Sequence, residues 1–469
     1  MILDKTVPIS RAGVLSTGLP HPYIACMTYD DAIAWWYGCI DFERRAPEPA
    51  DLKLELMRTL LDLLGNPHQY LRIVHVAGSK GKGSTSAMLA AVLRQAGYRT
   101  GLFTSPHLNA VEERIQVGGK PISATEIAAL LTELRTAIGT KLQPTFFEVG
   151  TALGFLHFLR RRVDVAVLEV GLGGRFDSTN VCRPALSVIT SISHDHTKIL
   201  GSKLEQIAFE KAGIIKPGRP VISGALAREA RPVIERIAQE RGCRLAELNR
   251  DFHLQYEPGA AGGRLPRVAI CTPNQTWPQM ELGLMGAHQA ANAAVVVACL
   301  EELRAQGLTI PDQAVAAGLA RVYWPARLEL LARSPWVVLD CAHNTASIEA
   351  LIDTLNESFP PGRRILIFAS SNDKDNPGML RLLAPQFDQF LLTEFSHNPR
   401  ATPAAELAAI LDDIANVPHR ICATPTQAWE IARSMARPND LIVIAGSVFL
   451  AGELRPLLLA ETRDSVPAA

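Results

Sequence analysis

The chain has 469 residues, of which 48% are hydrophobic and 20% are charged, so it can bury a large core and is not a disordered polypeptide. Lys and Arg together number 47, as do Asp and Glu, and this balance gives no electrostatic footprint for nucleic acid or for an anionic membrane. No apolar run is long enough to span a bilayer and the N-terminus has no signal-peptide pattern, which predicts a cytoplasmic protein without a membrane or nucleic-acid partner.

The eight cysteines are far apart, and none forms a C-x-x-C pair. A disulfide framework or a structural zinc site is therefore not expected, and we interpret the cysteines as buried free thiols in a reducing compartment. The sequence also has no heptad pattern, so we expect a monomer.

The first half of the chain alternates between strand-like and helical patterns. Residues 1–22 are rich in Gly, Pro and Ser and are expected to be irregular, and a helical pattern covers 29–64 up to a turn at 65–67. Strands are then expected at 72–77, 100–104, 163–170, 186–192 and 220–223, and helices at 84–95, 124–138, 148–161 and 204–212. This alternation predicts an α/β fold with a doubly wound, mainly parallel sheet.

The second half begins with a different pattern. Gly, Pro and short alternating segments at 243–283 indicate a small β insertion, and a helix is expected at 288–304. After Trp324-Pro325 a second α/β alternation begins, with strands expected at 336–339, 364–369, 390–393 and 441–445. We therefore divide the chain at residue 321. Residues 1–321 form a first domain that includes an N-terminal extension and the insertion, and residues 322–469 form a smaller α/β domain.

A glycine-rich segment between the strand at 72–77 and the helix at 84–95 reads Gly78-Ser79-Lys80-Gly81-Lys82-Gly83-Ser84. Backbone N–H groups at such a helix N-terminus bind anions, and glycines allow a phosphate to approach closely. Lys82 would contact the β- and γ-phosphates of a nucleotide, and Ser84 would bind Mg²⁺. The spacing is G-x-x-G-K-G-S rather than G-x-x-x-x-G-K-[ST], because Val76 stands where the first glycine belongs and Gly83 separates Lys82 from Ser84.

This spacing resembles the variant P-loop of the Mur ligase superfamily, and further motifs are similar to the folylpolyglutamate synthase and dihydrofolate synthase family. The motifs, in the family's order, are Thr104-Ser-Pro-His107, Glu113-Arg-Ile115, Glu169-Val-Gly-Leu-Gly-Gly174, Asp177-Ser-Thr-Asn180, Asp195-His196, Lys211-Ala-Gly-Ile-Ile-Lys216, Trp324-Pro-Ala-Arg-Leu-Glu329, Asp340-Cys-Ala-His-Asn344, Asp373-Lys-Asp375 and Gly446-Ser447. The resemblance implies an N-terminal P-loop ATPase domain of the Mur ligase type and a smaller, Rossmann-like C-terminal domain for glutamate ligation.

The same resemblance implies an ATP-dependent amide ligase that adds L-glutamate to a folate or dihydropteroate carboxylate. In this family ATP phosphorylates the carboxylate, the glutamate amine attacks the acyl phosphate, and phosphate leaves. The expected small-molecule partners are ATP, L-glutamate and a folate-type substrate, with two Mg²⁺ ions as cofactors. Many bacterial relatives use both dihydropteroate and reduced folates, so we expect a bifunctional enzyme.

The resemblance also implies a metal site at Ser84, Glu169 and His196. Glu169 ends a buried apolar strand, where a charge is costly unless it is paired or metal-bound. His196 follows another strand end, although Mg²⁺ prefers oxygen ligands. Lys211 matches a lysine that is carbamylated in this superfamily, a change that converts a cation into an anion able to orient a metal. His194 departs from the family pattern, and we interpret it as an incidental neighbour.

Residues of both domains are implied in nucleotide and glutamate binding. Asn292 and Arg327 fit the nucleotide site, and Arg327 would stabilise charge on the transferred phosphoryl group. Asp340 and His343 follow the strand at 336–339 and are implied at the ATP and glutamate side of the cleft. The predicted catalytic residues are Lys82, Lys211, Arg327, Asp340 and His343, and the predicted ATP site combines Gly78–Ser84 with Asn292, Arg327 and Asp340.

The folate end is implied by a second group of residues. Ser105, Pro106, His107 and Arg114 are expected in a substrate loop, and Glu148 would contact the pterin or support this loop. The flat pterin is expected to stack on an apolar wall. Ser447 is a candidate contact for the incoming glutamate. We expect the two domains to close over ATP and substrate and to exclude water from the acyl phosphate.

Two other functions are open at this point. A Mur ligase that adds an amino acid to a UDP-linked muramyl substrate would use the same chemistry, although the motifs at 105–107 and 324–327 argue against it. A nucleotide-dependent switch without ligase activity belongs to a different class of protein. The joint presence of Lys82, Glu169, His196, Lys211 and Arg327 argues against a switch.

Overall fold

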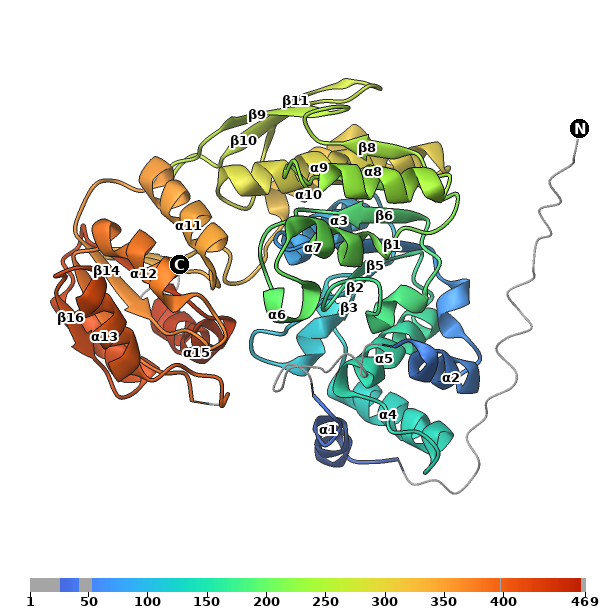
Figure 1. Ribbon diagram of the computed structural model, residues 1–469, viewed down its shortest axis with the longest axis horizontal. Helices are drawn as coiled ribbons and strands as arrows, with labels where there is room; N and C mark the ends of the chain where they lie inside the picture. The colour runs from blue at the N-terminus through green and yellow to red at the C-terminus, as the bar shows by residue number, and fades with distance from the viewer. Residues whose placement is uncertain (1–25, 42–52, 397, 465–469) are drawn as a thin grey trace, which may run out of the picture.

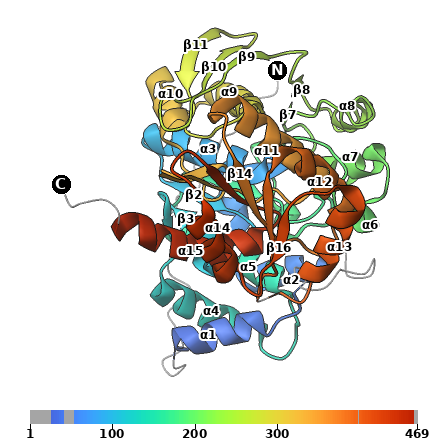
Figure 2. The same cartoon turned by 90° about the vertical axis from the view of Figure 1, so that its left-hand side faces the viewer.

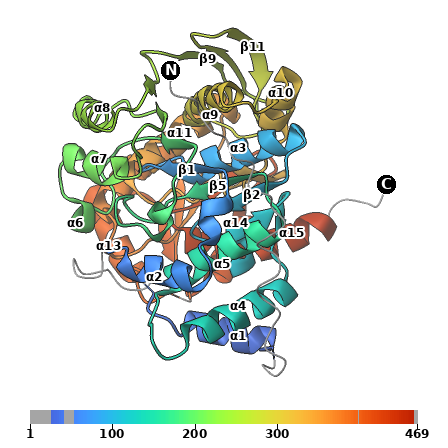
Figure 3. The ribbon, with the colours of Figure 1, turned by 90° about the vertical axis from the view of Figure 1, so that its right-hand side faces the viewer.

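The computed structural model describes residues 26–41, 53–396 and 398–464, so the irregular segment expected at 1–22 lies outside the described residues. The helical pattern expected at 29–64 is two helices rather than one, α1 (Tyr29–Tyr37) and α2 (Glu55–Leu63). The hydroxyl of Thr28 accepts the N–H of Asp31 and begins α1, and Gly38 ends it. Helix α1 lies beside α4 (Ala124–Ile138) at one end of the molecule (Figure 3).

The N-terminal half is built on an eight-stranded sheet with the order β4-β3-β2-β5-β1-β6-β7-β8. Its strands are β1 (Ile73–Ala77), β2 (Thr100–Phe103), β3 (Ile115–Val117), β4 (Lys120–Pro121), β5 (Val165–Glu169), β6 (Leu186–Ile189), β7 (Val221–Ser223) and β8 (Leu245–Glu247). All pairs are parallel except β2–β3 and β3–β4. The central strands β1, β5 and β6 are buried along their whole length, which explains why their sequences are mostly apolar, with His75, Glu169 and Ser187 as the exceptions.

Helices cover both faces of this sheet (Figure 1). Val74 and Val76 of β1 belong to a core with α3 (Lys82–Gln95), α9 (Ala287–Ala305) and α10 (Asp312–Arg321), whereas Ile73 belongs to the core under α4 and α5 (Phe146–Arg160). A third core lies under α7 (Leu204–Ala212) and α8 (Arg231–Glu240), and the short α6 (Thr197–Leu200) precedes them. Short 3₁₀ turns occur at η2 (Pro67–Tyr70), η3 (Val111–Arg114) and η4 (Ser178–Val181).

The β insertion expected at 243–283 is a three-stranded antiparallel sheet in the order β11-β10-β9. Its strands are β9 (His253–Glu257), β10 (Arg267–Cys271) and β11 (Thr276–Glu281). Strand β8 lies in the expected range but pairs with β7 in the large sheet, so the insertion begins after it. The indole N–H of Trp277 donates to the carboxylate of Glu301 on α9 and ties the small sheet to the domain.

The C-terminal domain has a six-stranded sheet in the order β12-β13-β17-β14-β15-β16, parallel except for β12 (Figure 2). Its strands are β12 (Glu329–Arg333), β13 (Trp336–Leu339), β14 (Arg364–Phe368), β15 (Gln389–Leu392), β16 (His419–Ile421) and β17 (Leu441–Ala445). One core packs under α11 (Thr345–Ser358), α12 (Asn376–Leu383) with η5 (Ala384–Gln386), and α13 (Ala404–Ile414); the other packs under α14 (Pro425–Met435) and α15 (Val448–Asp464). The predicted α/β fold with two mainly parallel sheets is confirmed.

The division at residue 321 stays a prediction; α10 ends at Arg321, and β12 begins eight residues later at Glu329. All eight cysteines are free, but Cys26 and Cys271 are exposed, and Cys39 and Cys243 are half-buried, so the expectation of burial is wrong for these four. In the described part of the chain, none of the helices combines the length and the apolar composition needed to cross a bilayer.

Candidate functional site

The phosphate-binding loop joins β1 to α3 and has no room for side chains at two of its glycines. A Cβ atom placed on Gly78 would lie 1.9 Å from the hydroxyl oxygen of Thr190. Gly81 has a φ of +81°, and a Cβ there would lie 2.4 Å from the amide oxygen of Asn292. Gly81 and Asn292, which were both predicted at the nucleotide site, are therefore in contact. The loop backbone is exposed to a ligand only because positions 78 and 81 are both glycine.

The loop is braced by hydroxyl groups that follow β6. Thr190 and Ser191 both donate to the carbonyl oxygen of Lys80, at 2.6 and 3.0 Å, and the N–H of Lys80 donates to Ser191 at 3.0 Å. The hydroxyl of Ser79 donates to the carbonyl of Ser193. Thr190, Ser191 and Ser193 were not among the predicted site residues. The signal was present, because the sequence Ile189-Thr-Ser-Ile192 follows a predicted parallel strand, where ligand-binding residues collect.

Two lysines converge on the beginning of this loop. The ammonium groups of Lys82 and Lys211 lie 3.2 and 2.9 Å from the carbonyl oxygen of Gly78. Lys211, on α7, is 3% exposed, and its burial, assisted by the nearby charge of Lys82, lowers its pKa to about 7. A substantial fraction of the Lys211 side chain is therefore an uncharged amine near neutral pH.

Glu169 ends β5 and faces the first turn of α3. Its carboxylate is 5% exposed and lies 3.5 Å from where a Cβ of Gly83 would be. Burial raises the pKa of Glu169 to about 7, although Lys82 acts in the opposite direction, and the N–H of Ser105 donates to it at 3.3 Å. A cation at this point would relieve the cost of the buried charge.

Two of the three residues predicted to bind Mg²⁺, Ser84 and Glu169, lie at the first turn of α3. Ser84 is buried in α3, one residue beyond Gly83, and Glu169 faces that turn, so these two residues fit an oxygen-ligated divalent ion. His196 precedes α6 in a left-handed conformation and is exposed, with Nε2 3.9 Å from Asp195. Among the described residues, no three His, Cys, Asp or Glu side chains converge on one point.

Asp195 joins the two domains electrostatically. Its carboxylate lies 2.8 Å from the ammonium of Lys80 in the phosphate loop and 3.8 Å from that of Lys374 in the C-terminal domain. Burial alone would raise the pKa of Asp195, but these cations hold it well below its usual range. Asp195 and Lys374 belong to motifs named above, yet the sequence alone gave neither residue a role.

The segment between α10 and β12 brings Arg327 close to Glu169 and the first turn of α3. The indole nitrogen of Trp324 lies 3.1 Å from where a Cβ of Gly83 would be, so this segment touches the first turn of α3. Burial disfavours the Arg327 charge, but Cys341, Asp340 and Glu169 together raise its pKa. The guanidinium is therefore close enough to Glu169 for a mutual charge effect between the two domains.

Asp340 and His343 follow β13, as predicted. The Asp340 carboxylate is buried and accepts the N–H groups of Leu328 and Ala342 at 2.8 and 2.7 Å, so it shapes the backbone next to Arg327. His343 Nδ1 lies 2.7 Å from the carbonyl of Cys341. Burial, together with the charge of Lys80, lowers the pKa of His343 well below its ordinary value.

The predicted substrate residues divide into two groups. Ser105 contacts Glu169, and beyond Pro106 the guanidinium of Arg114 donates to His107 Nδ1 at 2.8 Å and lies 5.1 Å from the centre of the Phe146 ring. This group lies beside the catalytic carboxylate.

Glu148 and Ser447 form the second group, and each caps a helix. Glu148 accepts the N–H and hydroxyl of Thr145 in a capping box at the start of α5, so it supports this helix, and its contact with a pterin stays a prediction. The hydroxyl of Ser447 accepts the N–H of Phe449 at the start of α15.

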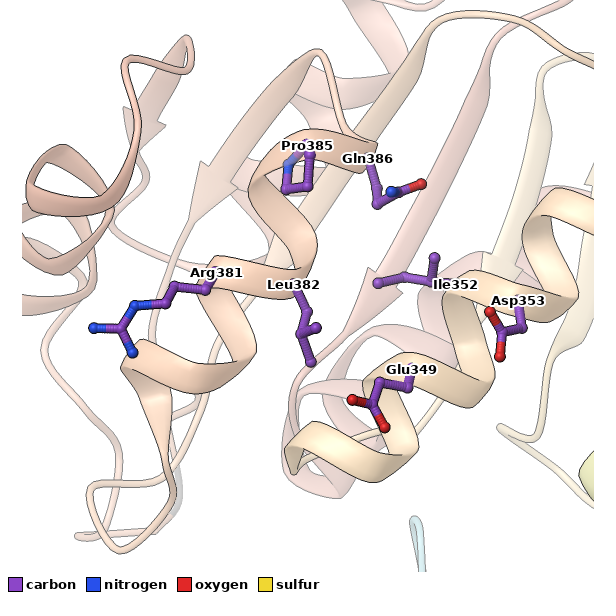
Figure 4. A pocket seen from close by; sticks show the side chains of 7 residues that line it. All are labelled: Glu349, Ile352, Asp353, Arg381, Leu382, Pro385 and Gln386. Atoms are coloured by element: carbon purple, nitrogen blue, oxygen red, sulfur yellow. The ribbon is translucent and has the colours of Figure 1, made fainter.

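A hollow between α11 and α12 lies elsewhere in the C-terminal domain (Figure 4). Ile352 of α11 and Leu382 of α12 point into it, whereas Arg381 points away from α11. Its lining contains none of the predicted site residues.

A phosphate loop in one α/β domain and an arginine supplied by a second one define an ATP-dependent ligase of the Mur type. The Mur ligase middle domain matches residues 76–300, and the Mur ligase glutamate ligase domain matches residues 326–448. The chain is 35% identical to the dihydrofolate synthase/folylpolyglutamate synthase of Bacillus subtilis, over 92% of this chain and 99% of that protein. It belongs to the folylpolyglutamate synthase/dihydrofolate synthase family of ATP-dependent ligases.

Solved structures are similar over nearly the whole chain. Escherichia coli FolC in complex with DHPP and ADP superposes with a TM-score of 0.82 at 29% identity, covering 92% of this chain and 98% of that one. The bifunctional enzyme of Yersinia pestis, solved with AMPPNP and a Mn ion, gives a TM-score of 0.81 at 27% identity over 92% and 98%. Members of this family therefore bind nucleotide, a divalent metal and a folate-type compound on this fold.

Proposed function

We propose that this chain joins L-glutamate to the carboxylate of dihydropteroate and of reduced folates, with ATP as the source of energy. The observation that carries the proposal is the meeting of Lys82, Glu169 and Arg327, from two domains, at the first turn of α3. Phosphoryl transfer to a carboxylate brings two anions together, and a cluster of cations beside a buried carboxylate suits that reaction.

In the first step Lys82 and the loop N–H groups hold the β- and γ-phosphates, and Arg327 stabilises the charge on the transferred group. Asn292 keeps the loop in position through its contact with Gly81. Mg²⁺ bound by Ser84, Glu169 and His196 would neutralise phosphate charge. The products of this step are ADP and the acyl phosphate of the folate substrate.

Lys211 is proposed to act as a carbamate. Its neutral amine would attack CO₂, forming an N–C bond and releasing one proton, so that a cation becomes an anion. Its burial and its pKa of about 7 support this reaction, which requires the unprotonated amine. The carbamate would place a further anionic group near the phosphate loop, where it could help to orient the metal.

In the second step the amine of glutamate attacks the acyl phosphate, and phosphate leaves. The carbonyl of Cys341 can only accept a hydrogen bond, so Nδ1 of His343 carries the proton and Nε2 is free to accept one. We propose that this unprotonated Nε2 accepts a hydrogen bond, and then the proton, from the attacking amine. Asp340 orients the neighbouring backbone, and Ser447 is proposed to contact glutamate.

The proposed ATP site contains residues of both domains, and we propose that the enzyme is a cytoplasmic monomer that closes over its substrates. Size-exclusion chromatography with light scattering tests the monomer. The activity is tested by mass spectrometry after incubation with ATP, Mg²⁺, glutamate and either dihydropteroate or tetrahydrofolate.

A gain of one glutamyl unit on both substrates supports the bifunctional activity, and a gain on one assigns a single step. ATP hydrolysis that needs no glutamate and gives no amide would favour a switch. A product from a UDP-muramyl substrate alone would favour the other Mur ligases.

A further inference from the structure

Arg327 stands between two residues with an unusual backbone conformation. Ala326 has a φ of +52° and Leu328 a φ of +47°, and neither is glycine. Side chains make this left-handed region unfavourable, so the conformation persists only where the surroundings hold it. The direction in which the chain presents Arg327 therefore depends on whatever fixes these two neighbours.

A buried carboxylate holds each neighbour. The N–H of Ala326 donates to Glu329 Oε2 at 2.8 Å, and the N–H of Leu328 donates to Asp340 Oδ2 at 2.8 Å. Both carboxylates are 8% exposed. Asp340 already belongs to the predicted catalytic residues, whereas Glu329 has no assigned role.

Glu329 is in turn fixed by an arginine from the end of the chain. Arg455 on α15 donates from Nε to Glu329 Oε2 and from Nη2 to Oε1, both at 2.8 Å, and Tyr323 bonds to both partners. A two-point contact of this kind fixes orientation as well as distance, which a lysine cannot do. The residues lie 126 positions apart in the sequence, so the pair ties α15 to the Arg327 segment.

We propose that Glu329 and Arg455 are positioning residues for Arg327. The pair locks the backbone at Ala326 and so aims the guanidinium at the transferred phosphoryl group, an inference that rests on the proposed function. Helix α15 begins next to Ser447, the proposed glutamate contact. The helix that would bind glutamate thus also sets the orientation of the residue that acts on ATP.

The test compares Arg455→Met with a matched variant, Arg433→Met. Arg433 on α14 makes an exposed ion pair with Glu461 of the same α15, at 3.0 Å, but has no link to Glu329. We expect Arg455→Met to lower kcat by about tenfold or more, because misplaced catalytic groups are costly, with an unchanged KM for the folate substrate. Arg433→Met should leave kcat unchanged, and Arg455→Lys should recover only part of the loss.

A double-mutant cycle separates positioning from general destabilisation. In an Arg327→Ala background, Arg455→Met should cause no further loss of kcat, because the group that it positions is gone. An equal loss in both backgrounds, or an Arg455→Met enzyme as fast as Arg433→Met, would overturn the inference. If Arg455→Met does not fold by circular dichroism, Glu329→Gln takes its place in the same cycle.

The coupling between Arg327 and Arg455 can also be measured without a folate substrate. For this purpose, calorimetry gives the AMPPNP affinity of the wild type, the two single variants and the double variant. A wild-type chain that binds AMPPNP but adds no glutamate would refute the proposed function alone. Additive effects on AMPPNP affinity in that case would refute the positioning role as well, and non-additive effects would support it.

Discussion

Lys82 and Lys211 direct their ammonium groups at a single atom, the carbonyl oxygen of Gly78. One lysine follows the glycine loop directly, and the other comes from α7, more than a hundred residues later. Two like charges this close disfavour each other, and Lys211, which is the more buried, has its pKa lowered to about 7. This difference fits the proposed roles of the two lysines, contact with phosphate for Lys82 and reaction with CO₂ for Lys211.

Lys82→Ala tests the cationic role. We expect kcat to fall by about 100-fold or more, as in other sites that lose one preorganised electrostatic group, with little change in melting temperature because Lys82 is half-buried and packs no core. The exposed Lys198→Ala is the control and should retain full activity. Near-normal turnover by Lys82→Ala would contradict the phosphate-loop assignment.

Lys211→Ala tests the carbamate. We expect the variant to lose turnover and short carboxylic acids to restore part of it by replacing the carbamate. CO₂ reacts with the neutral amine, whose fraction increases as the pH rises through about 7. At equal concentrations of dissolved CO₂, CO₂-depleted wild-type enzyme should therefore regain activity faster at pH 8 than at pH 6. A fully active Lys211→Ala variant would refute this role.

Gly81→Ala tests the close approach in the phosphate loop. Gly97→Ala is the matched control, because Gly97 also has a positive φ (+90°) but has nothing within 4 Å of its would-be Cβ. Both variants incur a backbone strain of about 1–2 kcal/mol, but Gly81→Ala also displaces Asn292. We expect a lower melting temperature and weaker ADP binding for Gly81→Ala than for Gly97→Ala; equal effects would show that the contact with Asn292 is unimportant.

We expect His75 to make the free energy of unfolding sensitive to acid. The side chain is fully buried in β1, with Nε2 2.8 Å from the hydroxyl of Thr179, and burial, with a contribution from Lys216, lowers its pKa to about 3. The unfolded chain binds a proton near pH 6.5 that the folded chain does not, so this stability is complete above pH 6.5 and is lost as the pH falls toward 3.

Relative to His75→Gln, the wild type should therefore lose up to about 1.4 kcal/mol of stability for each pH unit below 6.5. Urea unfolding of both proteins from pH 7.5 to 4.5 measures the difference. A difference that is constant over this range would show that His75 is not the titrating group.

Much of the fold could be predicted because its central strands are buried on both faces. Apolar runs such as β5 (Val165–Glu169) and β17 (Leu441–Ala445) are legible in the sequence for this reason. The break after α1 at Gly38 and the pairing of β8 with β7 were missed. Periodicity reports local geometry, whereas strand order and helix ends here depend on distant partners.

The site residues, too, divide into those that a local sequence pattern predicts and those that depend on distant parts of the chain. The position of Lys82 follows from a local strand–loop–helix pattern, but Asp195 and Lys374 meet only through the domain arrangement. Glu148 is instructive, because Thr145 and Glu148 carry the T-x-x-E signature of a capping box, which the sequence already contained. A residue that matches a family motif can thus be retained for helix formation as well as for chemistry.

Trp324 touches the first turn of α3 from the segment that leads into the C-terminal domain. Any rotation of that domain about this segment changes the surroundings of an indole ring at the mouth of the phosphate loop. The protein therefore carries an intrinsic fluorophore where the two domains meet. Emission from the wild type, with Trp324→Phe as the blank, would report the proposed domain closure in real time without an attached dye.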